Sequence, residues 1–178
     1  MGSRQVEKDS FRPATVMTLS RLGKVTNERQ SIGGAPWQIN GCPLKPTVVA
    51  VHDSKIFAAS HSGGEATPGV IFSVSNDGGK SFKPRGIVHP SAAVSDAPTI
   101  TVNGSRVLLA WHAKVGSAPR RVYYRFYSLS GEPIGEIQEL DSAPGVSQFP
   151  VTAARSDGSF QLLWQQADRI WSTTLTAK

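Results

Sequence analysis

The chain has 178 residues, of which 39% are apolar and 18% charged, and its 19 Lys and Arg against 13 Asp and Glu give a net charge of +6. This composition excludes a disordered chain, and 17 Gly and 12 Pro interrupt it too often for a helical bundle. No apolar run approaches the length of about 18 residues that a transmembrane helix needs, so we expect no membrane span. The single cysteine excludes an internal disulfide and a thiolate zinc site.

The N-terminal segment carries half of the excess positive charge. Residues 1–30 hold six Lys or Arg against three Asp or Glu, which leaves +3 for the other 148 residues. Apart from residues 120–125, nothing resembles a dense basic stripe interleaved with aromatic residues, so we expect no nucleic-acid partner. Met1–Ser3 resembles a cloning remnant and no secretion signal follows it. We therefore assign residues 1–13 to a remnant and an N-terminal arm.

The propeller segment that we predict begins at residue 14. Thr15–Arg21 has the pattern of a strand, and Leu22–Lys24 that of a turn. Together they indicate a partial blade over residues 14–45.

A repeat of 52 residues organises the rest of the chain. Similar apolar segments begin at Pro46, Pro98 and Pro150, and each is followed by a turn and a second apolar run. Third runs begin at Val70, Val122 and Ile170, and fourth strands are expected over 82–88 and 134–140. Helical periodicity is not sustained anywhere.

Four short antiparallel strands in each repeat are typical of the blades of a β-propeller. The sequence predicts an all-β propeller segment over residues 14–178, with complete blades at 46–97 and 98–149 and a second partial blade at 150–178. Jelly rolls and sandwiches also have short strands, but no fixed period is expected of them. The chain then contains about three blades, fewer than the four to eight that close a ring.

The turn between the third and fourth strands of the first complete blade reads Ser-Asn-Asp-Gly-Gly-Lys-Ser-Phe over residues 75–82. This pattern resembles the Asp box of sialidase-like, or BNR-repeat, propellers. Asp77 is expected to accept hydrogen bonds within the turn, Gly79 to take a positive φ, and Phe82 to pack beneath it. The resemblance implies that Ser75, Asp77, Gly79, Ser81 and Phe82 have a structural role.

A second segment, Trp37–Pro43, reads W-x-I-x-G-C-P and resembles a segment of exported bacterial sialidase-like propeller proteins. In these longer proteins it lies in the C-terminal half, which implies that the present chain corresponds to half of a six-bladed propeller of periplasmic or extracellular location. Cys42 then either has a disulfide partner in a missing N-terminal half or is a small buried residue.

Sialidases bind the substrate carboxylate with an arginine triad and use a tyrosine nucleophile activated by a glutamate. Their first arginine lies in a Phe-Arg-Ile-Pro motif, whereas Phe11-Arg12-Pro13 lacks the isoleucine. One missing residue reverses the faces of a strand. We therefore predict no catalytic residues and no cofactor. A sialidase-type glycoside hydrolase, or half of one, is the alternative.

A ligand-binding rim is predicted from two groups of residues. Arg121, Tyr123 and Arg125 alternate along a strand and therefore share one of its faces. His61 and His112 occupy matching positions just after the second strands of successive repeats. The arginine and tyrosine side chains either bind an anion or form a wet blade edge, and the histidines are either ligand-binding or ordinary loop residues. Without supporting carboxylates or thiolates the histidines predict no metal site.

The function that the sequence favours is noncatalytic binding or scaffolding, with a carbohydrate or a protein as ligand. Because an open ring exposes blade faces and strand edges, we expect self-association or a missing N-terminal half to complete it.

Overall fold

The structure is a computed structural model that describes residues 1–4, 7, 10–34, 37–41, 45–64, 68–92, 94–140 and 144–177. The described residues form fourteen strands and no helix that could span a membrane. The chain divides into two compact units, Met1–Val88 and His89–Lys178. Cys42, for which two roles were considered, lies outside the described residues.

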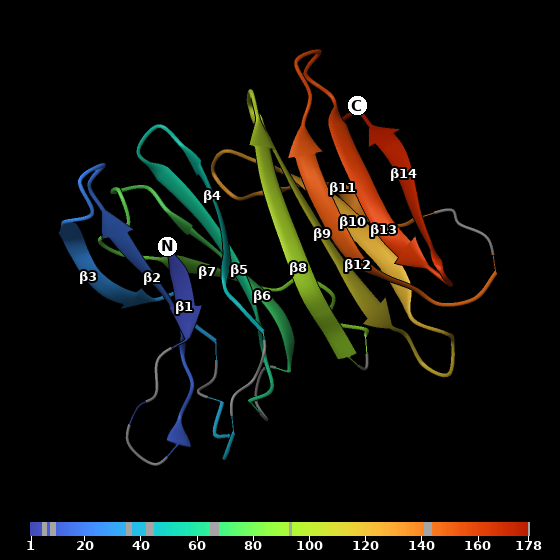
Figure 1. Ribbon diagram of the computed structural model, residues 1–178, viewed down its shortest axis with the longest axis horizontal. Helices are drawn as coiled ribbons and strands as arrows, with labels where there is room; N and C mark the ends of the chain where they lie inside the picture. The colour runs from blue at the N-terminus through green and yellow to red at the C-terminus, as the bar shows by residue number, and fades with distance from the viewer. Residues whose placement is uncertain are drawn as a thin grey trace. The chain divides into compact units, whose positions relative to one another are not determined.

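The first unit contains two antiparallel sheets, in the orders β1-β2-β3 and β4-β5-β6-β7 (Figure 1). Their strands are β1 (Gly2–Arg4), β2 (Ala14–Leu19), β3 (Val25–Ser31), β4 (Val48–His52), β5 (Lys55–Ser62), β6 (Gly69–Ser75) and β7 (Lys83–Ile87). The second unit has the orders β8-β9-β10-β11 and β12-β13-β14. Its strands are β8 (Val94–Asn103), β9 (Arg106–Lys114), β10 (Arg121–Ser128), β11 (Pro133–Glu139), β12 (Ser147–Ala154), β13 (Phe160–Gln166) and β14 (Arg169–Leu175).

These four sheets confirm the all-β fold with antiparallel blades that the repeat predicts. The two complete repeats are the two four-stranded sheets, and the two partial blades have three strands each. One difference concerns the N-terminus, because Gly2–Arg4 forms strand β1 and pairs with β2 instead of lying in an arm. The first sheet is therefore one strand wider than expected.

A second difference concerns the first strand of two repeats. Strands β8 and β12 begin before Pro98 and Pro150, and their pairing shifts register where the prolines lie. Proline cannot donate to a ladder, and a bulge accommodates it. The apolar segments that mark the repeat thus begin inside the strands.

Each unit has its own apolar core between its two sheets. In the first, Val16 and Ile32 pack with Ala58 and Ile71. In the second, Leu162 and Trp164 of β13 pack against Ala110 and Val122. The inner strands β5, β6 and β9 are buried almost throughout, as expected for sheets covered on both faces.

The strand order fixes which residues can form a site. Because neighbouring strands are antiparallel, the first and third strands of each sheet begin where the second and fourth strands end. The Ser75–Phe82 turn joins the end of β6 to β7, whereas His61 and Ser62 lie at the end of β5, so the turn and these two residues lie at opposite ends of the strands.

Candidate functional site

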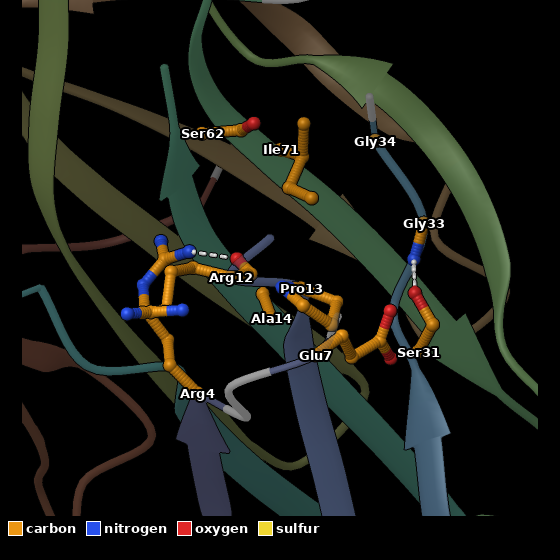
Figure 2. A pocket seen from close by; sticks show the side chains of 10 residues that line it. All are labelled: Arg4, Glu7, Arg12, Pro13, Ala14, Ser31, Gly33, Gly34, Ser62 and Ile71. Atoms are coloured by element: carbon orange, nitrogen blue, oxygen red, sulfur yellow. Dashed lines mark hydrogen bonds between the residues drawn. The ribbon is translucent and has the colours of Figure 1, made fainter. Parts of the chain in front are cut away.

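A cavity of about 200 Å³ lies in the first unit, where β1 ends, β2 begins and β3 ends. It is lined by residues from five segments of the unit: Arg4, Glu7, Arg12, Pro13, Ala14, Ser31, Gly33, Gly34, Ser62 and Ile71. Figure 2 shows both arginine side chains on one side of the cavity, with Glu7 and Ser31 on the other. We call this cavity the Arg12 pocket.

The Arg4 guanidinium is held by hydrogen bonds to neighbouring segments. Its Nε donates to the carbonyl oxygen of Lys45 at 2.7 Å and its Nη1 to that of Arg12 at 2.9 Å. Its Nη2 donates to the Ser60 hydroxyl at 2.9 Å and to the carbonyl oxygen of His61. A guanidinium with this many partners orders the backbone around it, and here it fixes the position of residue 12.

Arg12 has a different environment. Its Nη1 donates one long hydrogen bond of 3.3 Å to the carbonyl oxygen of Phe11, and no described carboxylate pairs with it. The side chain is half-buried and lines the pocket. A guanidinium presents five N–H donors in a planar fork that matches a carboxylate. Arg12 thus retains most of its donors for a ligand.

The Arg4 guanidinium packs on an aromatic ring. The Arg4 guanidinium carbon lies 5.3 Å from the centre of the Trp37 ring, which is within the range of a cation–π contact. Trp37 meets His61 in a T-shaped contact at 5.3 Å, and a Cβ on Gly63 would lie only 2.5 Å from its indole. Trp37 therefore packs against Arg4, one of the residues that line the pocket.

The opposite wall requires glycine. Gly34 has a φ of 88°, and a Cβ there would lie 2.7 Å from the Ile71 side chain. An L-residue would be strained in this region and would also collide with β6. Beside it, Ser31 accepts a hydrogen bond from the N–H of Gly33 at 3.1 Å, which fixes the turn after β3.

The Ser75–Phe82 turn is organised around one carboxylate. Asp77 accepts from the hydroxyls of Ser75 and Ser81 at 2.7 and 2.6 Å, and from the N–H groups of Lys80 and Ser81 at 3.0 Å each. The hydrogen bonds from Ser81 and Ser75 hold the pKa of Asp77 far below its usual range. The turn follows the end of β6, whereas the pocket lies at the opposite end of these strands, near Ser62 at the end of β5.

Two other residues of this turn serve its packing. Gly79 is buried with a φ of 89°, and a Cβ there would lie 2.7 Å from Thr18. Phe82 packs against the apolar core of the first unit.

The predicted rim residues do not form one group. In the second unit, Tyr123 donates to Glu139 at 3.1 Å and Arg121 lies 3.6 Å from the same carboxylate. Arg125 instead donates to the carbonyl oxygen of Gly135 at 2.8 Å. It lines a separate groove with Tyr124, where the pairing of β10 and β11 shifts register.

The two histidines that occupy matching positions are buried inside strands and do not lie in loops. His61 belongs to β5 of the first unit and His112 to β9 of the second. His112 Nδ1 accepts a hydrogen bond from the N–H of Phe149 at 3.1 Å. No group of three or more metal-ligating side chains occurs among the described residues.

A further buried histidine escaped the sequence analysis. His89 Nδ1 accepts from the indole N–H of Trp111 at 3.2 Å, and its ring lies 4.6 Å from that of Tyr123. Burial lowers the pKa of His89 and raises the pKa of Tyr123 to about 12. At neutral pH both side chains are therefore uncharged. No repeat or motif distinguishes His89, and only the fold reveals its partners.

Arg4 also escaped the sequence analysis, since residues 1–13 were assigned to an arm. Gly33 and Gly34 carry a signal that was available, because consecutive glycines after a strand indicate a turn of unusual conformation. Nothing in the local sequence indicates that this turn faces the arginines.

Comparison with known proteins gives likeness in structure alone. No protein-family model matches the chain, and no curated protein matches it. An α-L-arabinanase from Penicillium chrysogenum, solved with arabinobiose, is 15% identical to this chain, with a TM-score of 0.62. The match covers 97% of this chain and 55% of the arabinanase chain. An endo-arabinase from Bacteroides thetaiotaomicron matches 97% of this chain and 73% of its own at 14% identity, with a TM-score of 0.57.

Sucrose-6-phosphate hydrolase from Lactobacillus gasseri matches 92% of this chain and 38% of its own at 11% identity, with a TM-score of 0.53. The GH43 protein BlXynB from Bacillus licheniformis is covered over only 28% of its length, so the chain spans a part of several of these proteins. The likeness shows the fold: the chain is a β-propeller segment built of antiparallel blades.

Proposed function

We propose that the protein is a noncatalytic propeller module that binds the carboxylate group of an acidic sugar in the Arg12 pocket. The observation that carries this proposal is the Arg12 guanidinium, which lines the cavity with one weak hydrogen bond and no described ion pair. A carboxylate can accept two parallel hydrogen bonds from such a fork. A lysine would supply the charge without this geometry.

The surroundings of Arg12 favour binding because they are already ordered. Arg4 holds the carbonyl oxygen of residue 12 and is itself held by three other acceptors. A ligand therefore does not have to order this part of the backbone when it binds. Glu7 and Ser31, on the far side of the pocket, supply acceptors for sugar hydroxyl groups.

Two further observations favour a carbohydrate. The Ser75–Phe82 turn and the Trp37–Pro43 segment resemble those of sialidase-like propellers, whose ligands are acidic sugars. The structural neighbours include an arabinanase, an endo-arabinase and a sucrose-6-phosphate hydrolase, all named for carbohydrate substrates. We include an exported location in the proposal on the same resemblance.

The lining of the pocket favours binding without hydrolysis. Most glycoside hydrolases need a pair of carboxylates, and sialidases use a tyrosine with a glutamate. Among the residues that the structure describes, Glu7 is the one carboxylate that lines the pocket, and no tyrosine lines it.

A glycoside hydrolase remains the second candidate, and one observation favours it. Tyr123 and Glu139 are hydrogen-bonded beside Arg121, which are the residue types of a sialidase nucleophile. However, Tyr123 is only 7% exposed and has a pKa of about 12, so at neutral pH it is a buried, protonated phenol. A buried phenol with a raised pKa is a poor nucleophile.

The test is a calorimetric titration with N-acetylneuraminic acid and with glucuronic acid. We expect weak, salt-sensitive binding that Arg12→Ala abolishes and Arg21→Ala preserves, since Arg21 lies in the exposed turn after β2. The neutral methyl esters should bind no better than the Arg12→Ala variant binds the acids. Equal binding by both arginine variants would contradict the proposal.

A further inference from the structure

The same irregularity interrupts the first strand of both sheets in the second unit. Ala97 in β8 and Phe149 in β12 have φ values of 47° and 53°, and each precedes a proline. Left-handed backbone is uncommon for a residue other than glycine, and a following proline favours extended backbone instead. Residues 97 and 149 are 52 positions apart, so this strained bulge occupies matching positions in the second and third repeats. Strain of this kind concentrates at functional sites.

Phe149 is held firmly although its side chain is turned outward. Its N–H donates to Nδ1 of His112 at 3.1 Å, and the two rings form a T-shaped contact at 5.3 Å. His112 is only 3% exposed, whereas Phe149 is 54% exposed. The buried imidazole thus anchors an aromatic ring that remains open to solvent.

Residues with hydrogen-bonding side chains adjoin Phe149 in the chain or pair with its partner His112 in the sheet. Gln148, its neighbour in β12, accepts a hydrogen bond from Arg120 Nη1 at 3.2 Å. Asp96 pairs with His112 in the adjacent strand and accepts from the N–H of Ala97 at 2.7 Å. The matching bulge of the preceding repeat carries Ala97, which has no ring. The exposed ring of Phe149 thus belongs to the same end of the sheets as an amide, a guanidinium and a carboxylate side chain.

We propose that Phe149 is a platform on which the C–H face of a neutral sugar ring stacks, with Gln148, Arg120 and Asp96 binding its hydroxyl groups. A sugar ring has apolar faces and a polar edge, and therefore requires an aromatic surface with donors and acceptors at its side. All three polar residues lie at the same end of the strands. Asp96 and Gln148 lie near the starts of β8 and β12, and Arg120 directly precedes β10.

An apolar protein surface is the competing occupant, because Val146 and Val151 are also exposed in or near β12. Two features favour the sugar. The bulge shifts the register between Gln148 and Val151, so Phe149 does not continue the alternation of the strand that follows it. Gln148, which precedes it, is hydrogen-bonded to the charged Arg120, whereas the core of a protein interface is depleted of charged groups.

This site is independent of the Arg12 pocket, since it uses other residues in the other unit and an uncharged ligand. The two proposals can therefore fail separately. Arg12→Ala should leave neutral-sugar binding unchanged, and Phe149→Ala should leave acidic-sugar binding unchanged.

The experiment is a saturation-transfer NMR titration of the full chain with arabinobiose, cellobiose and lactose. We expect at least one of them to bind, and Phe149→Ala to weaken it by about tenfold or more, as for other exposed aromatic anchors. Trp171→Ala is the matched control, because Trp171 is 44% exposed on β14 and belongs to no such bulge. It should bind as the wild type does.

Substitutions of His112 test whether sugar binding requires the contact that holds the Phe149 ring in place. His112→Asn keeps an acceptor near the place of Nδ1 and should retain binding, whereas His112→Leu should lose it. Two results would overturn the proposal: no neutral sugar binds, or Phe149→Ala binds sugar as well as the wild type. If the Phe149→Ala variant with unchanged sugar binding also loses self-association, the surface belongs to a protein partner.

Discussion

Ser75 holds together the turn between β6 and β7, and its removal should destabilise the protein measurably. The side chain is buried, and its hydroxyl donates to Asp77 at 2.7 Å while accepting from the N–H groups of Gly79 at 2.8 Å and Asp77 at 3.4 Å. In Ser75→Ala the buried N–H of Gly79 loses its acceptor. A buried donor without a partner costs about 1–3 kcal/mol.

This loss corresponds to a fall in Tm of about 2–12 °C, since 1 kcal/mol shifts the Tm of a chain of this size by about 2–4 °C. The assay is urea unfolding followed by tryptophan fluorescence, together with calorimetry. The urea concentration at the midpoint should fall, while the slope of the unfolding free energy against urea stays unchanged, because unfolding exposes the same amount of surface.

Ser128→Ala is the matched control. Ser128 ends β10 as Ser75 ends β6, but it is less buried and accepts at 3.2 and 3.3 Å. Equal losses in both variants, or no loss in Ser75→Ala, would refute this reasoning.

Three further predictions follow from the described contacts. The protein should lose stability as the pH falls below about 6.5, because burial lowers the pKa of His89 and the unfolded chain therefore binds the proton more tightly than the folded protein does. His89→Gln should flatten this part of a plot of Tm against pH. An unchanged slope in this variant would contradict the prediction. At lower pH, stability should fall again as Asp77 is protonated, since its pKa lies below that of the unfolded chain, and Asp77→Asn should remove this second fall from the same profile. The protein should not hydrolyse a fluorogenic sialoside, and turnover above buffer that disappears in Arg12→Ala would refute the noncatalytic assignment.

Self-association is a fourth prediction, and it concerns the open edge of the last sheet. Within the part of the chain that the structure describes, strand β14 pairs with β13 alone, and Ile170 and Trp171 are exposed on it. Open strand edges with apolar residues favour pairing with another chain. We expect a dimer by light scattering behind a sizing column, and Ile170→Lys should shift it towards the monomer. A wild-type protein that stays monomeric at high concentration would contradict this prediction.

The fold could be predicted from the sequence because the repeat is a long-range signal. The 52-residue spacing of Pro46, Pro98 and Pro150 identifies the blades without any knowledge of packing, and the observed sheets confirm it. The start of the strands could not be predicted, since a proline inside a strand is exceptional and here depends on a bulge stabilised by tertiary contacts.

The candidate sites were less predictable, because each of them joins residues that are distant in sequence. Arg4 approaches Arg12 only because β1 pairs with β2, and three residues are too few to indicate a strand. Phe149 was overlooked since the repeat pattern was aligned on Pro150, and its contact with His112 spans 37 residues. The periodicity of the sequence predicts which side chains share a face of a strand. Which residues from different strands meet at the strand ends depends on how the sheets pack.

The claim that Arg12 receives a carboxylate can be tested most directly by arginine-selective ¹⁵N NMR of the Nε–H groups during titration with N-acetylneuraminic acid. The account predicts that the Arg12 signal, assigned through its loss in Arg12→Ala, moves and saturates. The Arg4 signal should change little, because its Nε–H is already hydrogen-bonded to Lys45. A titration in which Arg12 does not move, or in which exposed arginines such as Arg21 move equally, would contradict the account.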